Sequence, residues 1–213
     1  MTSNRPPRES KWLIQQSGNV QASALRLFIG VELDDAVRDS AAAIANSLRR
    51  HIGQRVDARW VPASNLHITL WFIGNVTDDR ADEILRALDR PFTIPVFTVH
   101  IAGLGAFPSS GAPRVFWLGV QSGAGPLTGL YAGLATRLLP LGIEPERRAY
   151  SPHLTIARVK VARAGKADAD LRASFHVVAA DAGTCSVSRV TVFRSHLSPK
   201  GATYEPLLRV PLQ

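Results

Sequence analysis

Two short segments decide what this chain can fold into: N-L-H-I-T-L-W at residues 65–71 and P-H-L-T-I at residues 152–156. In a β-strand successive side chains point to opposite faces, so the histidine and threonine of each segment, two positions apart, share one face. The apolar residues between them supply the other face, which can pack on a core. Each segment is therefore predicted to be a strand with one apolar face and one His-Thr face.

The repetition makes these pairs, His67 with Thr69 and His153 with Thr155, informative. From the composition, the chance of two such tetrads with apolar residues at the second and fourth positions is of order 0.002. A single histidine on an apolar strand is more often a core residue bonded to its neighbour. Two matching copies favour instead a pair of imidazoles facing each other across one cleft.

The rest of the chain alternates strands and helices in two comparable halves, with one His-Thr segment in each. We therefore expect an α+β fold of two pseudo-symmetric lobes, each an antiparallel sheet with helices packed outside, around a central cleft. We expect residues 1–23 to be a flexible N-terminal extension and residues 25–213 to form the two-lobed domain. Expected strands cover 25–33, 55–61 and 65–73 (the last two as a hairpin), 92–104, 114–120, the segment from 152, 185–196 and 204–210, and expected helices cover 36–50, 77–88, 125–139 and 168–173.

The composition is that of a folded protein with a basic balance. Apolar residues make up 46% and charged residues 20%, and 25 Lys and Arg against 17 Asp and Glu give a net charge of +8. A basic balance weakly favours a polyanionic partner such as RNA or a phosphorylated metabolite. No apolar run approaches the roughly 18–20 residues needed to cross a bilayer. With no recognisable leader and only Cys185, we expect a cytoplasmic monomer without a membrane partner.

A cleft with two imidazoles suits displacement at phosphorus. Histidine, with an ordinary pKa of about 6.5, can act as acid or base near neutral pH. One neutral imidazole can take a proton from the attacking water while the other gives one to the leaving oxygen. The threonine hydroxyls can donate to the non-bridging phosphate oxygens. Because the sequence has no Cys pair, HExxH or close His/carboxylate cluster, we expect no metal and no cofactor.

At this point the residues resemble a known family, the two-histidine (2H) phosphoesterases, and within it the RNA 2′,3′-cyclic phosphodiesterases once described as 2′-5′ RNA ligases. The resemblance covers nearly all of residues 25–213, and the two tetrads are its most specific part. The supporting blocks, in order, are R-L-F-I-G-V-E-L, R-W-V-P-A-S-N-L-H-I-T-L-W-F-I-G, L-G-A-F-P, R-V-F-W-L-G-V, S-P-H-L-T-I-A-R, V-F-R-S-H-L and Y-E-P-L.

The resemblance implies hydrolysis of RNA-terminal or nucleoside 2′,3′-cyclic phosphates to 2′-phosphates. It implies that His67 is the proton donor to the leaving 3′ oxygen and His153 the base for water, although the sequence itself does not determine which histidine plays which part. Thr69 and Thr155 would hold the phosphate. Arg158 matches the family's arginine after the second tetrad.

Simple alternation places Arg158 on the face opposite His153, so a strand end or bulge near Ala157 is needed for the arginine to reach the phosphate. Tyr150, in a turn, is a candidate for stacking on a base. Phe28 and Phe72 could also stack, but core packing is the better interpretation of both.

The motif His196-Leu197-Ser198 repeats the spacing, but Pro199 argues against an interior strand, so we interpret it as a decoy. Two alternatives remain for the function. The same site could ligate or cleave 2′-5′ RNA linkages or hydrolyse a small cyclic phosphate, such as one derived from ADP-ribose. A protein of another class, a noncatalytic module that binds RNA ends, could use the imidazoles and the arginine only to hold phosphate.

Overall fold

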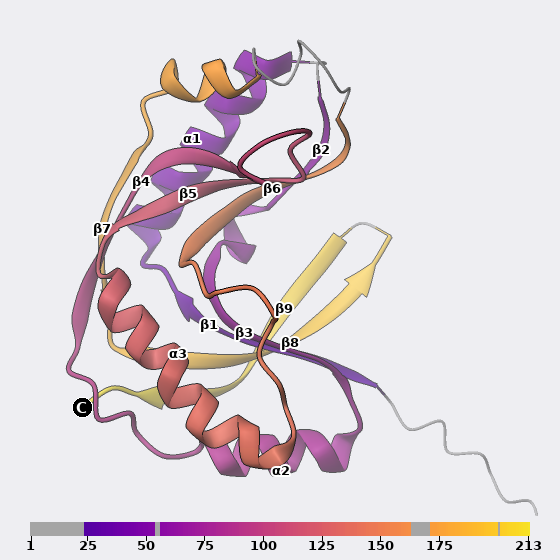
Figure 1. The fold of residues 1–213 in the computed structure, drawn as a ribbon, viewed down its shortest axis with the longest axis vertical. Coiled ribbons are helices and arrows are strands. Elements are labelled where there is room, and N and C mark those ends of the chain that lie inside the picture. The colour runs from indigo at the N-terminus through magenta and orange to yellow at the C-terminus, as the bar shows by residue number, and fades with distance from the viewer. Residues whose placement is uncertain (1–23, 54–55, 163–170, 200) are drawn as a thin grey trace, which may run out of the picture.

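The computed structural model describes residues 24–53, 56–162, 171–199 and 201–213, and side chains at 161 and 162 are not described (Figure 1). The extension expected at residues 1–23 lies outside the described residues. The strands are β1 (Leu25–Glu32), β2 (Val56–Trp60), β3 (His67–Val76), β4 (Phe97–Phe107), β5 (Val115–Ser122), β6 (His153–Ala162), β7 (Asp181–Val187), β8 (Arg189–Ser198) and β9 (Gly201–Pro211). The helices are α1 (Asp35–Ile52), α2 (Asp78–Leu88) and α3 (Ala124–Leu138), with short 3-10 turns η2 (Ala63–Asn65), η3 (Leu139–Leu141) and η4 (Ser174–His176).

Local chemistry explains where α1 begins and ends and where α2 begins. The Asp34 side chain accepts a hydrogen bond from the Val37 amide at 2.9 Å and so caps α1. Gly53 ends that helix with φ 53°, a left-handed value that glycine adopts without strain. Thr77 caps α2 through the Arg80 amide. The expected helix at 125–139 is confirmed as α3, which buries the leucines at helical spacing, Leu127, Leu130, Leu134 and Leu138.

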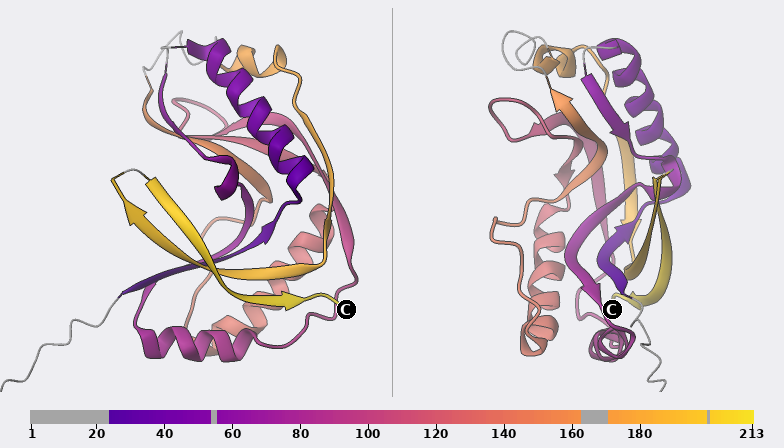
Figure 2. Two further views of the ribbon diagram at one scale, coloured as in Figure 1. Left: turned by 180° about the vertical axis from the view of Figure 1, so that it is seen from behind. Right: turned by 90° about the vertical axis from the view of Figure 1, so that its right-hand side faces the viewer.

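The strands form one strongly curled antiparallel sheet (Figures 1 and 2). Its order is β7-β4-β5-β6-β3-β1-β8-β9, and β2 adds to β6 beside this path. A single residue pair, Ile68 opposite Leu154, joins β3 to β6 at the middle of the sheet. An α+β fold with an antiparallel sheet is thus confirmed.

The two halves of the sheet do not correspond to the two halves of the chain. One half holds β7, β4, β5 and β6, and the other holds β3, β1, β8 and β9, so each takes strands from the first and second parts of the sequence. Helix α1 packs on β7 and β6, in the half of the sheet that does not contain β1. Helices α2 and α3 pack on each other, α2 against β1 and α3 against β3 and β5 (Figure 2).

The expected hairpin between residues 55–61 and 65–73 is wrong. β2 pairs with β6, with Arg59 opposite Arg158, while β3 lies between β1 and β6. The start of β3 is therefore joined to β6 at Ile68, and β2 pairs with β6 rather than with β3. The turn η2 redirects the chain, and the Val61 amide donates to the Ile156 carbonyl at 2.9 Å at the point where β2 ends.

The single strand expected over 185–196 is also wrong, because it consists of two strands that meet at Ser188. β7 pairs with β4 in one half of the sheet, and β8 pairs with β1 and β9 in the other, so the chain crosses the sheet here. The helix expected at 168–173 lies partly outside the described residues, which are helical at 171–173.

Candidate active site

The pairing of β3 with β6 brings the two His-Thr motifs together. Because Ile68 lies opposite Leu154 in an antiparallel pair, the neighbouring positions place each histidine opposite the threonine of the other motif: His67 opposite Thr155, and His153 opposite Thr69. Residues opposite one another share a face of the sheet. Ile68 and Leu154 are 0% exposed on the other face, which packs into the core as the alternation predicts.

Both imidazoles are held by the main-chain carbonyl two residues before them. His67 Nδ1 lies 2.7 Å from the Asn65 oxygen, and His153 Nδ1 lies 2.7 Å from the Ser151 oxygen. A carbonyl can only accept, so Nδ1 of each neutral ring carries the proton and Nε2 carries the lone pair. The local chain thus sets the same tautomer at both sites.

His67 lies in an aromatic box. Its ring is 4.8 Å from Phe28, 5.3 Å from Tyr204 and 6.1 Å from Phe193, measured between ring centroids. Its Nε2 is 3.0 Å from the Thr69 hydroxyl, which can donate to the free lone pair. The pKa of His67 is lowered to about 4, mainly by burial and also by the positive charges of Arg158 and His153, while the bond to the Asn65 carbonyl acts the other way.

His153 has a different environment. Its ring meets Phe107 edge-on, at 5.0 Å and 84°. Burial is the main cause of the lowered pKa of His153, and the charge of Arg158 adds to it, while the Ser151 bond and the negative charge of Glu146 act the other way. Arg158 therefore acts on both imidazoles, and His153 acts on His67, as expected for groups that converge on one place.

Arg158 reaches this face because β6 contains a bulge. Phe116 pairs with Ala157 but the next residue, Trp117, pairs with Thr155, so Ile156 is an extra residue on β6. Ile156 and Ala157 are both buried, and Arg158 is exposed. The irregularity expected near Ala157 is confirmed, and it restores Arg158 to the face that carries His153 and Thr155.

Tyr150, the candidate for stacking on a base, has its ring stacked on another protein side chain. Its ring stacks on Tyr131 at 4.6 Å and 6°, and its hydroxyl donates to the main-chain oxygen of Thr69 at 3.3 Å. Of the two phenylalanines, Phe28 is 3% exposed, which confirms core packing, but Phe72 is 42% exposed, so a core position for Phe72 is wrong. Phe28 also touches the His67 ring, a contact that the sequence does not reveal.

A cavity of about 620 Å³ opens beside His67, with Asn65, Phe193 and Tyr204 also in its lining. His153 lies outside this lining, so the cavity extends the site on the His67 side only. Glu32, opposite His67 on β1, also lines it.

Arginines hold the Glu32 carboxylate in place. Glu32 accepts from Arg189 at 3.2 Å, from Arg209 at 3.0 and 3.1 Å, and from the buried Thr191 hydroxyl at 2.8 Å. Burial acts to raise the pKa of Glu32, but the bonds and charges of these partners outweigh it, and the pKa is lowered. The carboxylate next to His67 is thus kept charged and engaged with arginine.

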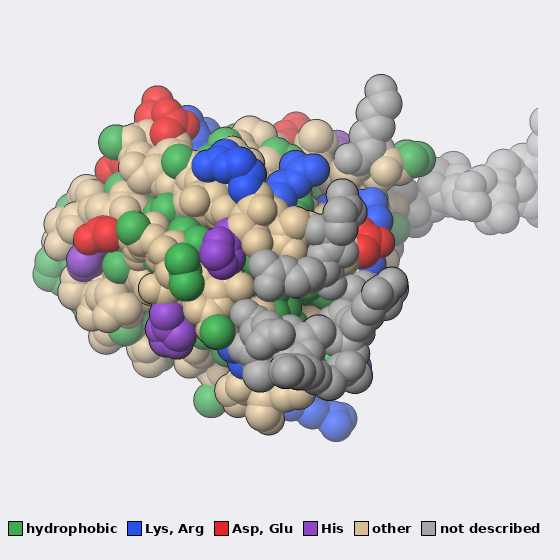
Figure 3. All heavy atoms as spheres, turned by 90° about the horizontal axis from the view of Figure 1, so that it is seen from above, with side chains coloured by type: hydrophobic (Ala, Val, Ile, Leu, Met, Phe, Trp, Pro, Cys, Tyr) green, Lys and Arg blue, Asp and Glu red, His purple; other side chains and the backbone are tan. Residues whose placement is uncertain are grey.

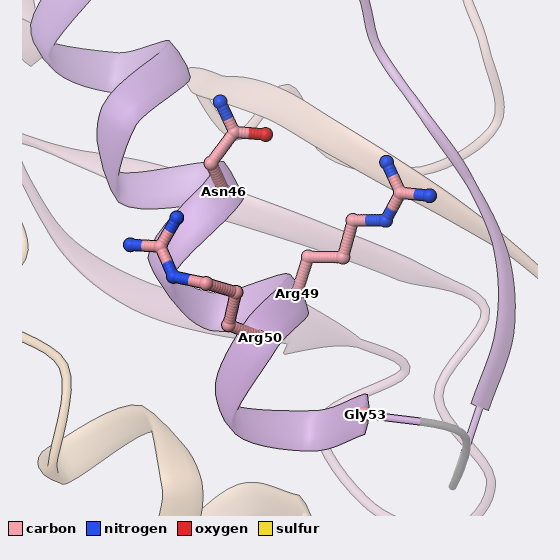
Figure 4. Close-up of a pocket in the computed structure, with 4 residues that line it drawn as sticks. All are labelled: Asn46, Arg49, Arg50 and Gly53. Carbon is pink, nitrogen blue, oxygen red and sulfur yellow. The ribbon is translucent and has the colours of Figure 1, made fainter.

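A second hollow, of about 370 Å³, lies at the C-terminal end of α1, lined by Asn46, Arg49, Arg50 and Gly53. The guanidinium groups of Arg49 and Arg50 point away from each other there (Figure 4). On the face seen from above, Lys and Arg side chains occur at several separate places rather than in one continuous patch (Figure 3).

The surroundings of His196 differ from those of the two motif histidines. It lies in β8 but is exposed, and its Nε2 pairs with Glu205 at 2.7 Å across the β8–β9 hairpin. Pro199 follows the end of that strand.

Among the described residues, no group of three or more His, Cys, Asp or Glu side chains is placed to hold a metal ion. No helix in the same part of the chain is both long and apolar enough to span a membrane.

Several residues of the site were missed from the sequence. Asn65 also contacts β9, because its side-chain amide donates a hydrogen bond to the main-chain oxygen of Ala202 at 2.6 Å. Tyr204, Phe193 and Phe107 lie in the resembling blocks Y-E-P-L, V-F-R-S-H-L and L-G-A-F-P, but nothing in their spacing indicates contact with a histidine. The sequence indicated only that these three residues lie in blocks resembling the family, and it did not indicate what any of them does.

The comparison with protein families agrees with this geometry. The model described as LigT like phosphoesterase matches twice, at residues 31–117 and 118–204, with one His-Thr motif in each match. The chain belongs to the LigT-like phosphoesterase family.

Several relatives of the chain are named RNA 2′,3′-cyclic phosphodiesterase. The one from Archaeoglobus fulgidus is 33% identical over 86% of this chain and 98% of its own length, and that from Methanothermobacter thermautotrophicus is 34% identical over 84% and 95%. The crystal structure of TT0787 from Thermus thermophilus has a TM-score of 0.68 at 26% identity, over 87% of this chain and 97% of that one. E. coli LigT complexed with 3′-AMP shares the fold, with a TM-score of 0.66 at 24% identity over 90% and 99%.

Proposed function

We propose that the protein hydrolyses 2′,3′-cyclic phosphates at RNA ends or on nucleosides, leaving a 2′-phosphate, and that His67 and His153 are its catalytic acid and base. The observation that carries the proposal is the pairing of the two motif strands at Ile68 and Leu154, which turns both His-Thr pairs to one face. The relatives named RNA 2′,3′-cyclic phosphodiesterase, which match over most of the chain, support the choice of substrate.

In this mechanism the neutral imidazole of His153 takes a proton from water as the water oxygen bonds to phosphorus. The bond from phosphorus to the 3′ oxygen breaks, and protonated His67 gives its proton to that oxygen. The family resemblance assigns the two roles in this order. Catalysis of this kind is typically worth about 10² to 10⁴ in rate for each positioned group.

The lowered pKa values mean that both rings are neutral in the free protein near pH 7. An anion close to an imidazole favours its charged form and raises its pKa. We therefore propose that the acid acquires its proton when the negatively charged cyclic phosphate binds. Proton uptake on binding is the expected signature, measurable by calorimetry in buffers of different ionisation enthalpy.

Thr69, Thr155 and Arg158 would bind the non-bridging phosphate oxygens. Their place supports this, since each threonine lies opposite the other motif's histidine and the charge of Arg158 acts on both rings. Donors aimed at the oxygens where charge develops lower the barrier most. Tyr150 would contribute to substrate binding through β3, because its hydroxyl holds the Thr69 carbonyl.

The two halves of the sheet would act as two lobes of one domain, residues 25–213, around the phosphate. The narrow junction between β3 and β6 supports this division.

The decisive experiment incubates the protein with nucleoside 2′,3′-cyclic phosphates and with RNA ending in one, in buffer with EDTA, and identifies the product by ³¹P NMR. We expect a 2′-phosphate. Formation of 2′-5′ linkages instead would support the ligase alternative, and binding without turnover would support a noncatalytic module. A 3′-phosphate product would contradict the assigned leaving group.

A further inference from the structure

Two aromatic side chains, Phe107 and Trp117, continue the site outward on the His153 side. Trp117 on β5 lies opposite Thr155 on the neighbouring strand β6 and opposite Gly105 on the other neighbour, β4. Opposite residues share a face, so Trp117 lies on the face that carries the His-Thr pairs. Phe107 is two residues beyond Gly105 on β4 and therefore lies on that face too.

A missing side chain on β4 makes room for the Trp117 ring. A Cβ at Gly105 would lie 2.2 Å from the ring carbons Cη2 and Cζ2 of Trp117, so the ring occupies the space above this glycine. Gly105 is not among the described glycines with positive φ. Its lack of a side chain is thus required for space, and the ring lies across β4.

Packing holds the Trp117 ring in this position. Its Nε1 is buried and has no hydrogen-bond partner in the described part of the chain, although a buried tryptophan N–H usually finds one. The Phe107 ring lies 5.3 Å from it at 38°. Phe107 in turn meets the His153 ring at 5.0 Å, so the two aromatic rings and the imidazole are contiguous.

The aromatic wall, Phe107 with Trp117, is more open than two of the three rings around His67. Phe28 and Phe193 are 3% and 7% exposed, whereas Tyr204 is partly exposed. Phe107 and Trp117 are both partly exposed. An aromatic surface that is fixed by packing, partly open and adjacent to a phosphate site is a stacking platform for a nucleobase.

We infer that the Phe107–Trp117 wall is a nucleobase-binding subsite of this enzyme. The inference rests on the proposed function, because it assumes that the phosphate lies between the two histidines. A base would stack on the wall, and because every base has a π-face, the subsite would tolerate all four. The base could belong to the terminal nucleoside or to the nucleotide before it.

Three substrates separate these sources: a nucleoside 2′,3′-cyclic phosphate, a dinucleotide that ends in a 2′,3′-cyclic phosphate, and the base-free 1-O-methylribose 2′,3′-cyclic phosphate. In Trp117→Leu we expect KM for base-containing substrates to rise about tenfold, within the range that loss of one stacked base produces. The kcat values, and the KM for the base-free substrate, should change little. If KM in Trp117→Leu rises for both the nucleoside and the dinucleotide substrate, the terminal base lies on the wall. If KM rises for the dinucleotide alone, the base of the preceding nucleotide lies there.

The matched control is Trp60→Leu. Trp60 lies opposite the buried Ala157 and packs on the buried Phe116, away from the wall, so KM should stay unchanged once thermal unfolding shows that both variants fold. Gly105→Ala keeps the tryptophan but displaces its ring, and it should raise KM in the same direction. Unchanged KM in both Trp117→Leu and Gly105→Ala, or an equal rise for the base-free substrate, would overturn the inference.

If the wild-type protein turns over none of the three substrates, the proposed function fails, and calorimetry still tests the subsite. A nucleoside 2′-phosphate should then bind more tightly than 1-O-methylribose 2′-phosphate, and Trp117→Leu should abolish the difference. Equal Kd values for the two ligands would overturn the inference independently of turnover.

Discussion

The strands β3 and β6 carry the same motif and differ in what surrounds it. His67 and His153 are each held at Nδ1 by a carbonyl two residues earlier, at the same distance of 2.7 Å. His67, however, is enclosed by aromatic rings and bonded to Thr69, whereas His153 meets Phe107 edge-on at one side of a more open wall. The repeated motif determines the tautomer, and the different surroundings determine how strongly each ring resists protonation.

A similar comparison applies to the glycines beside the two motifs. Gly30 lies opposite Thr69 on β1, and Gly119 lies opposite His153 on β5. A Cβ at Gly30 would lie 2.8 Å from the Ile68 oxygen and 3.2 Å from the His67 ring, whereas one at Gly119 would lie 3.0 Å from the Ala102 oxygen. The His67 site is thus the more tightly packed of the two.

The largest expected effect is loss of either imidazole. His67→Ala and His153→Ala should each lower kcat about 10² to 10⁴-fold, because each removes one of the two proposed proton-transfer groups. His196→Ala, which changes the exposed histidine of the decoy motif, is the matched control and should leave kcat unchanged. Near-normal turnover by either site variant would refute two-histidine catalysis.

Loss of a threonine hydroxyl should have the next largest effect. Thr69→Val and Thr155→Val keep the shape of the side chain and should lower kcat about 10²-fold, the scale for removing one donor to a developing oxyanion. Steady-state kinetics of both variants tests whether the two motifs contribute equally. A rise in KM with unchanged kcat would show that the hydroxyls bind ground state and transition state alike.

Replacement by alanine should have a larger effect at Gly30 than at Gly119. Gly30→Ala places its new methyl group against the β3 backbone, so β1 and β3 must shift; we expect about 1 to 3 kcal/mol lower unfolding free energy, the usual range for overpacking. Activity should fall with it, because the His67 ring lies next to that methyl group. Urea unfolding and kcat of Gly30→Ala and Gly119→Ala measure the contrast. Equal effects would mean that the two sites are packed alike.

The smallest effect concerns pH. Burial is the main cause of the pKa of about 4 at His67, so Tyr204→Ala, which opens the aromatic box, should raise that pKa toward about 6.5. The acid form is lost as pH rises through the pKa, so the alkaline limb of kcat/KM should move to higher pH if His67 is the acid. NMR titration of the His67 ring measures the shift directly.

Tyr204→Phe keeps the ring and is the control for this experiment, with the pKa staying near its wild-type value. If the alkaline limb of the kcat/KM profile follows the titration of His153 instead, His153 is the acid and His67 is the base.

Much of the site could be predicted from the sequence, because a β-strand has a local period of two. His67 and Thr69 had to share a face, and so did His153 and Thr155, whichever strands lay beside them. The need for an irregularity before Arg158 followed from the same period, and the bulge at Ile156 meets it. The partner of β2 could not be predicted, because a tight turn after residue 61 is as compatible with a hairpin as with the observed pairing to β6.

By itself, then, the sequence determined the residue types, their faces and the presence of two matching motifs, since these depend on covalent order and short-range geometry. Only the tertiary structure decided that β3 and β6 are neighbours, that strands of both chain halves mix in each half of the sheet, and that one imidazole is more enclosed than the other. Strand pairing and burial depend on residues far apart in the chain, and the free energy of desolvating a charge depends on everything that surrounds it.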